Sequence, residues 1–271
     1  PSHSYMRYLY KYPQREYPYS LLVEENARRS RSDPPFGLLD TGVFGENRYW
    51  DLEVAYAKAS PDEIHIRIII SNRGPETAEL HILPTLWFRN TWSWGITSDP
   101  RPIIKAGKIS KGASWAVEAD HPNLRYYLYG RQEARLLYTE NESNYQRLWN
   151  QPNPTPYVKD AFHRFIVNGD KDAVNPVQKG TKFAAWYTYT VASGRQEVIE
   201  MVLSARPMQA PFKKTTVTFS NRESEANKFF NDLLPGAGKD DRLIIQQAFA
   251  GMIWSKQFYN YDLSRWLDGD M

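Results

Sequence analysis

The sequence has no cysteine, and this absence excludes several kinds of chemistry at once. Disulfides, thiolate metal ligands, cysteine nucleophiles and thiol redox switches all need that side chain. A chain without disulfides is compatible with a reducing compartment, so we expect a cytoplasmic protein. The 5 histidines are scattered, and only His65 and His81, on neighbouring predicted strands, are candidates to meet. We therefore expect neither a metal nor a cofactor.

Excess charge and long apolar runs are also scarce. The 34 basic and 31 acidic residues leave a formal net charge of +3, too small to indicate nucleic-acid binding. The longest apolar run, residues 248–254, falls far short of the roughly 20 residues that a membrane span needs. The sequence does not open with a secretory signal. We expect no nucleic-acid partner and no membrane partner.

Aromatic residues are plentiful, at 14% of the 271 positions, with 18 Tyr and 9 Trp. Large rings bury much area and stack on other rings or on sugar faces. A β-protein rich in tyrosine and tryptophan therefore favours carbohydrate binding as a function. The alternative is that most of these rings fill the interior of the sheets.

The residue pattern between about 49 and 203 is typical of strands. Trp50, Leu52, Val54 and Tyr56 alternate with polar residues, and residues 64–70 carry isoleucine at every second position. Turn residues at 72–75 and 192–195 predict two hairpins, one joining 64–70 to 78–88 and one joining 183–191 to 197–204. Many short strands and few helices predict a mainly β fold, an antiparallel β-sandwich.

Two regions depart from this strand pattern. Residues 141–175 form a long polar stretch with several prolines, within which residues 162–167 predict a short strand. After Pro211 the apolar spacing becomes helical. Ser220 and Glu223 resemble a capping box that begins a helix over 223–234, and a second helix is predicted over 240–259.

Common catalytic motifs are not found, but one segment resembles a binding site. The sequence has neither a nucleophile elbow nor a phosphate-binding glycine loop. A catalytic carboxylate pair cannot be chosen among 31 acidic residues. In residues 86–95 (LWFRNTWSWG), Trp92 and Trp94 are placed to stack on a sugar while Arg89 and Asn90 bond its hydroxyls. The alternative is a structural anchor in which Arg89 pairs with a buried acid.

Five longer motifs extend over nearly the whole sequence. They are SYMRYLYKYPQ at 4–14, LPTLWFRNTW at 83–92, TENE at 139–142, PYVKDAFH at 156–163 and QAFAGMIWSKQFY at 247–259. Together they resemble the bacterial glucosidase-like proteins of glycoside hydrolase family 63. That family includes mannosyl-oligosaccharide glucosidase and the mannosylglycerate hydrolases.

The resemblance implies an N-terminal β-supersandwich joined by a helical linker to an (α/α)6 barrel. It also implies cleavage of α-glycosidic bonds with inversion, by two carboxylic residues of the barrel. We accordingly expect an N-terminally truncated sandwich at 1–212, a linker at 213–238 and the first helix of a truncated barrel at 239–271. Neither catalytic carboxylate matches a position here. The expected role of this chain is therefore to brace the barrel and wall the substrate pocket.

The implied barrel geometry places the C-terminal residues Tyr261, Trp266, Asp268 and Asp270 near the substrate rim. The alternative is that they only pack the end of a helix or lie free. Carbohydrate is the expected partner, bound through the barrel. Without that barrel the apolar face of residues 240–259 is expected to self-associate. Two other functions remain open: a stand-alone carbohydrate-binding or structural β-domain, and a hydrolase of the mannosylglycerate type.

Overall fold

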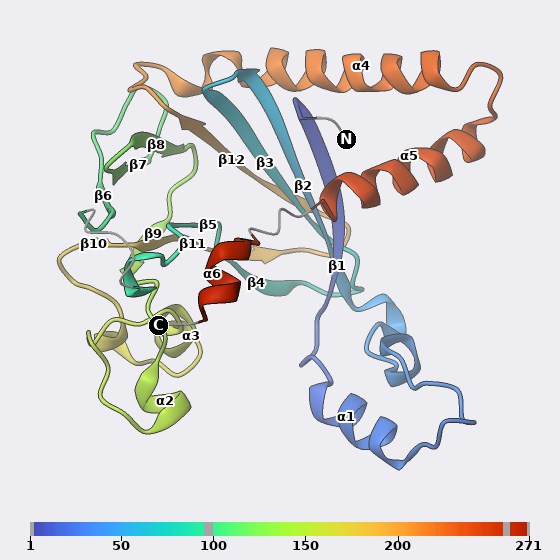
Figure 1. Cartoon of the computed structure of the whole chain (residues 1–271). Helices are drawn as coiled ribbons and strands as arrows, with labels where there is room; N and C mark the ends of the chain where they lie inside the picture. Colours follow the sequence, from blue (N-terminus) through green and yellow to red (C-terminus); the bar gives the residue numbers. More distant parts are fainter. Residues whose placement is uncertain (1–2, 95–99, 257–260, 270–271) are drawn as a thin grey trace.

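Two antiparallel β-sheets pack face to face, as seen in a computed structural model that describes residues 3–94, 100–256 and 261–269 (Figure 1). The larger sheet has the strand order β1-β2-β3-β12-β8-β7-β6-β10. Its strands are β1 (Tyr5–Pro13), β2 (Tyr49–Ser60), β3 (Glu63–Asn72), β6 (Ile103–Ala106), β7 (Trp115–His121), β8 (Leu124–Gly130), β10 (Lys179–Gly180) and β12 (Gln196–Ser204). The expected mainly β, antiparallel architecture is thus confirmed.

The smaller sheet is organised around one central strand, β11 (Lys182–Val191). Its partners are β4 (Ala78–Ile82), β5 (Thr85–Trp87) and β9 (Arg135–Thr139). The strands β4 and β5 pair with successive stretches of β11, while β9 pairs with the same stretch as β5. Because β11 is enclosed in this way, its alternate residues face either the larger sheet or the outside.

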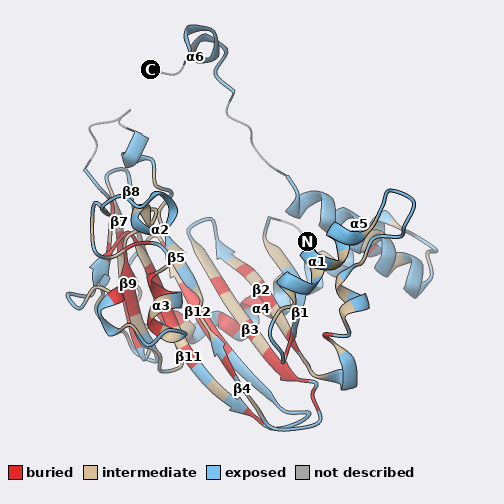
Figure 2. Ribbon diagram, turned by 90° about the horizontal axis from the view of Figure 1, so that it is seen from below, coloured by how far each residue is buried: buried red, intermediate tan, exposed pale blue. Residues whose placement is uncertain are grey.

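The core lies between the two sheets, where buried residues gather in Figure 2. Trp50 and Val54 of β2 and Ile70 of β3 meet Phe183 and the other inward residues of β11 in one cluster. This arrangement confirms the predicted alternation, since apolar residues two positions apart share one face of a strand. The opposite face of β2 and β3 carries mainly polar and small residues, with Ile69 as an exception.

The two predicted hairpins are wrong, because both turns carry the chain from one sheet to the other. The strand β3 pairs with β2 and β12, whereas β4 pairs with β11. Likewise β11 and β12 belong to different sheets. His65 and His81 therefore lie on different sheets, not on neighbouring strands. Turn residues mark where a strand ends, but they do not determine which strand comes beside it.

A fully buried asparagine joins these two corners. The side chain of Asn72 donates to the carbonyls of Glu76 and Val191 and accepts from the Gly74 amide and the Gln14 side chain. Its backbone also bonds the turn at Gly194 and Arg195. With every polar group satisfied, this residue fixes both crossings between the sheets.

The described helices pack on the sandwich or stand beside it. They are α1 (Tyr19–Arg28), α2 (Tyr145–Trp149), α3 (Ala161–Ile166), α4 (Thr215–Leu233), α5 (Lys239–Trp254) and α6 (Leu263–Asp268), with short 3-10 turns at Leu38–Thr41, Gly45–Asn47, Trp92–Trp94, Lys171–Ala173 and Pro211–Lys214. The strand predicted at residues 162–167 is wrong, since α3 occupies this stretch and packs Phe162 and Phe165 on the outer face of the smaller sheet. None of the described helices is long and apolar enough to cross a membrane.

The long helix α4 lies across the outer face of the larger sheet (Figure 1). Phe219 packs against Ala55 and Ala57 of β2, and the Arg67 guanidinium sits 4.2 Å from its ring centroid. His65 of β3 is fully buried and bonds the hydroxyl of Thr215 at 3.0 Å. The predicted capping box at Ser220 is wrong, because the sheet contacts extend the helix back to Thr215.

The helix α5 returns along α4 and ends near the edge strand β1. Phe249 contacts Phe230 of α4, and the Trp254 ring meets Tyr8 of β1 edge to face, with 5.6 Å between centroids. Several of its apolar side chains remain exposed, among them Ile244 and Met252. Beyond it, α6 stands clear of the sandwich (Figure 2).

Candidate functional site

The segment predicted to bind sugar surrounds a buried carboxylate, that of Glu142. Asn90 Nδ2 donates to it at 2.8 Å, Trp92 Nε1 at 2.6 Å and Arg101 Nη2 at 2.7 Å. The Glu142 side chain is only 8% exposed, so these donors replace water around the charge. The N–H groups of Asn90 and Trp92 are therefore committed to the fold. Their predicted contact with a substrate stays a prediction.

Arg89 and Trp94, from the same segment, are directed differently. The Arg89 guanidinium lies 5.1 Å from the centroid of the Trp94 ring, which is itself half-exposed. The alternative that Arg89 pairs with the buried acid is wrong, since Arg101 takes that position. Arg89 instead faces an open cavity of about 430 Å³.

We call this cavity the cationic pocket. Its lining residues come from β5, from the segment after it, from the 141–159 region and from the start of β11: Thr85, Trp87, Arg89, Asn90, Asn141, Lys159 and Lys182. Lys182 pairs with Trp87 in the strand register, and its ammonium donates to the Lys159 carbonyl at 2.7 Å. Burial, with a smaller contribution from the Lys159 charge, lowers the pKa of Lys182.

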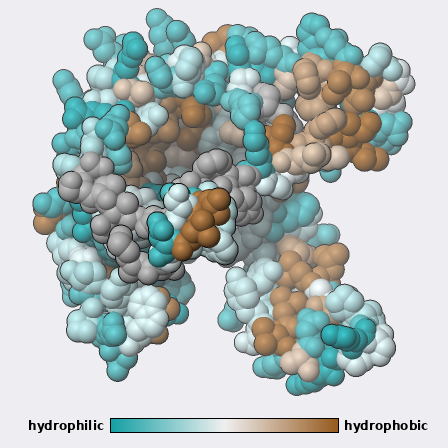
Figure 3. Space-filling model, viewed as in Figure 1, coloured by the Kyte–Doolittle hydropathy of each residue, from teal (hydrophilic) through white to brown (hydrophobic). Residues whose placement is uncertain are grey.

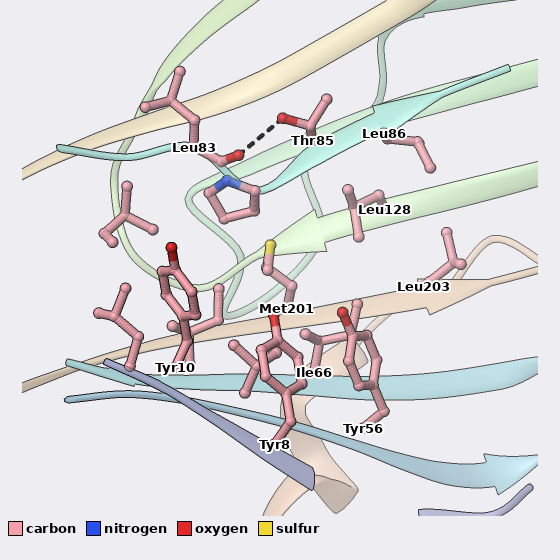
Figure 4. Close-up of a pocket in the computed structure, with 15 residues that line it drawn as sticks. Tyr8, Tyr10, Tyr56, Ile66, Leu83, Thr85, Leu86, Leu128, Met201 and Leu203 are labelled. Carbon is pink, nitrogen blue, oxygen red and sulfur yellow. Dashed lines mark hydrogen bonds between the residues drawn. The ribbon is translucent and has the colours of Figure 1, made fainter. Parts of the chain in front are cut away.

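A second cavity lies between the sheets and is lined by side chains of both (Figure 4). One part has a volume of about 300 Å³ and is lined by Tyr8, Tyr10 and Tyr56 together with aliphatic side chains of both sheets. The three hydroxyls point into the space between the sheets (Figure 4). Burial, and to a lesser extent Tyr8, raises the pKa of Tyr56, so its hydroxyl stays protonated near neutrality.

The other part of this cavity is larger, about 830 Å³, and more polar. Tyr12, Arg15, Glu16, Glu79, His81 and His163 are among its lining residues. The two parts share Tyr10, Leu52, Ile82 and Leu83 as lining residues, so they lie next to each other. We call the two parts together the tyrosine groove.

Strand alternation explains the row of tyrosines. On β1, Arg7 and Lys11 point to the outer face and bond Glu53 and Asp51 of β2. Tyr8, Tyr10 and Tyr12 therefore share the opposite face. They are 42%, 49% and 39% exposed, and the Tyr10 and Tyr12 rings stack with 6.1 Å between centroids. The every-second-residue spacing in YLYKY was a signal for this row that sequence reasoning did not use.

The C-terminal candidates lie apart from both cavities. Tyr261 and Trp266 are exposed and contact each other, with 6.2 Å between ring centroids, and Asp268 ends the exposed helix α6. Asp270 lies outside the described residues. Their predicted place at a substrate rim stays a prediction. Within the described ranges, no group of histidine and carboxylate side chains is arranged to hold a metal ion.

Comparison with known proteins adds one relative in sequence. No family model matches the chain. An uncharacterized protein of Saccharomyces cerevisiae, YMR196W, is 33% identical over 313 aligned residues. The alignment covers 100% of this chain and 29% of the yeast protein. The chain therefore spans less than a third of the length of the curated relative it matches.

Three solved structures show a remote likeness to this chain. A putative aldose 1-epimerase from Escherichia coli K12 is 10% identical, with a TM-score of 0.34 over 77% of this chain and 67% of that one. A putative kojibiose phosphorylase from the human microbiome is 10% identical, with a TM-score of 0.32 over 76% of this chain and 22% of that one. A galactose mutarotase related enzyme from Lactobacillus acidophilus is 5% identical, with a TM-score of 0.35 over 78% of this chain and 70% of that one. Likenesses of this size carry no argument about function.

Proposed function

We propose that this chain is the β-sandwich part of an inverting α-glycoside hydrolase of the family 63 type, and that it binds oligosaccharide in the tyrosine groove without cleaving it. The five motifs quoted above support the family. The length of the yeast relative leaves room for a separate catalytic domain. The single observation that carries the binding role is the row of half-exposed tyrosines on β1.

Such a row suits a chain of sugars for two physical reasons. Tyrosine rings offer flat apolar faces for the C–H faces of pyranose rings, at a low cost in side-chain entropy. Their hydroxyls donate and accept hydrogen bonds, as sugar hydroxyls do. The groove also offers room for more than one sugar ring, because its aliphatic part and its polar part adjoin.

Calorimetric titration with α-linked gluco-oligosaccharides tests this binding. We expect the double variant Tyr10→Ala/Tyr12→Ala to lose at least about tenfold in affinity, equivalent to ~1.4 kcal/mol. Tyr19→Ala is the matched control, since Tyr19 is a more exposed tyrosine on α1 outside the groove. Equal affinity in the double variant, with its circular dichroism unchanged, would remove the tyrosine row from the proposal.

A hydrolysis assay on the same sugars tests whether this chain binds oligosaccharide without cleaving it. We expect no cleavage by this chain alone. Adding mannosylglycerate to the panel separates the glucosidase from the mannosylglycerate alternative. If the chain cleaves any member, the proposal of a binding role is wrong, and the groove carboxylates Glu16 and Glu79 become the residues to substitute.

A further inference from the structure

We propose that the cationic pocket is a second ligand site, which binds a small sugar carrying a phosphate or a carboxylate group. The site is separate from the tyrosine groove. It lies across β5 from the groove, with Thr85 lining both cavities, while Trp87 and the three cations line only the pocket.

Three cationic side chains converge on this pocket from distant parts of the sequence. Arg89 follows β5, Lys159 precedes α3 and Lys182 opens β11. Within the part of the chain that the structure describes, none of the three forms an ion pair with a carboxylate, in contrast to Lys11 or Arg67. A cavity bordered by several positive charges without paired carboxylates attracts an anion.

The nearby carboxylates are already engaged by other donors. Glu142 is held by Asn90, Trp92 and Arg101, and Glu140 accepts from the Thr181 hydroxyl at 2.7 Å. Asp160 accepts from Asn144 Nδ2 at 3.1 Å and lies near Arg147. The Asp160 charge favours the protonated form of Lys182, but burial and the Lys159 charge outweigh it and lower the pKa of Lys182. The positive charges of the pocket are therefore only partly compensated.

The framework of the pocket keeps its cations in place before any ligand arrives. The Lys182 ammonium lies over the Phe162 ring of α3, 5.1 Å from its centroid, and one of its hydrogens bonds the Lys159 carbonyl. Its other two hydrogens remain for a ligand. Arg89 is positioned by the ring of Trp94. Holding two like charges close together has a cost, and a bound anion would offset it.

The sugar part of the ligand is argued from Trp87. Its side chain is 54% exposed and lies beside Lys182 in the strand register. An exposed indole next to cations offers a stacking face for a pyranose ring whose anionic substituent reaches the lysines. Asn90 and Asn141 contribute mainly to the frame, since their amide groups donate to Glu142 and to the Phe88 carbonyl.

Titration calorimetry with four probes tests the proposal: glucose 6-phosphate, glucuronate, glucose and inorganic phosphate. We expect one of the two anionic sugars to bind at least about tenfold more tightly than glucose and than inorganic phosphate. The tighter of the two identifies the anionic group. We expect Lys159→Met/Lys182→Met to lose that affinity at least about tenfold, and Trp87→Ala to bring the sugar phosphate or uronate down to the level of inorganic phosphate.

Two controls make the result specific. Lys108→Met removes an exposed lysine outside the pocket and should leave binding unchanged. Tyr10→Ala/Tyr12→Ala alters only the groove and should leave binding of the anionic sugar unchanged. This variant therefore distinguishes binding at the cationic pocket from binding in the tyrosine groove. Equal binding of glucose, equal binding of inorganic phosphate, unaltered binding in the lysine variant, or no binding of either anionic sugar would each overturn the proposal.

Discussion

Single polar residues determine much of this fold, and Tyr138 is the exception among them. Asn72 and Glu142 are buried with all their polar atoms bonded. The Tyr138 hydroxyl is buried in the core with no hydrogen-bond partner among the described residues. Burial accordingly raises the pKa of Tyr138 to about 12. A hydroxyl in this position costs stability because its lost hydration is not replaced.

Tyr138→Phe is therefore expected to raise the free energy of unfolding, by about 1 kcal/mol. Tyr187→Phe is the matched comparison. The Tyr187 hydroxyl accepts from Trp115 Nε1 at 3.0 Å, so its removal should lower stability by a similar amount. Urea denaturation of the two variants measures both signs. Loss of stability in Tyr138→Phe would mean that its hydroxyl has a partner after all.

Residue types alone located only part of the candidate sites. Arg89, Asn90, Trp92 and Trp94 drew attention as a compact run. The fold places Asn90 and Trp92 on a buried acid, while Arg89 lines a cavity and contacts the Trp94 ring. Lys159 and Lys182 could not be recognised, because the sequence separates them from Trp87. The strand register brings Lys182 beside Trp87, and the segment before α3 brings Lys159 to the same cavity.

At the scale of elements, the sequence predicted which face of a strand is buried better than it predicted which strands pair. Alternation along β2 and β3 follows from local geometry, so it was right. Partner choice depends on long-range packing, and both hairpins were wrong for that reason. The short helix α3 was also missed. Its β-favouring residues Phe162 and Phe165 are buried by tertiary contacts with the smaller sheet, which override local propensity.

The edge strand β1 depends on charges as well as on backbone bonds. Asp51 of β2 accepts from Lys11 of β1 at 2.6 Å and from Arg73 at 2.7 Å. Burial alone would raise the pKa of Asp51, but these two bonds outweigh it and lower that pKa. A carboxyl whose pKa falls on folding stabilises the protein above its unfolded pKa of about 3.9, and this stabilisation disappears as the pH falls through the folded pKa.

Lys11→Met should thus destabilise the protein by about 0.5–1 kcal/mol near neutrality, and by progressively less as Asp51 becomes protonated. Urea denaturation at about pH 7 and at about pH 3 measures the two differences. Lys108→Met serves as the control, with no such pH dependence. A Lys11→Met effect of equal size at both pH values would show that the ion pair contributes nothing to the attachment of β1.

At the scale of the molecule, the predicted order of a β body followed by helices is confirmed, and the described helices leave an apolar surface uncovered. Brown residues gather over α5 in Figure 3. Leu243, Ile244, Phe249 and Met252 are among its exposed side chains, with Met252 at 73%. Apolar surface of this kind promotes association between molecules.

We expect this chain to self-associate as its concentration rises, measured by light scattering. Ile244→Glu/Met252→Glu should shift the apparent mass toward that of the monomer, because two charges would have to be buried in the contact. Val177→Glu changes an equally exposed apolar residue in a loop and should have no effect. A constant monomer mass for the unaltered chain at high concentration would contradict the expectation.

The pairing of β3 with β12 also has a consequence for the time course of folding. Arg67 and Glu200 bond across these strands although 133 residues separate them along the chain. A ribosome must therefore complete β12 before the larger sheet can close, and until then β3 presents an unpaired edge. Contacts of such separation slow folding toward the millisecond-to-second range. Until β12 is made, the unpaired edge of β3 exposes the nascent β1-β2-β3 unit to aggregation.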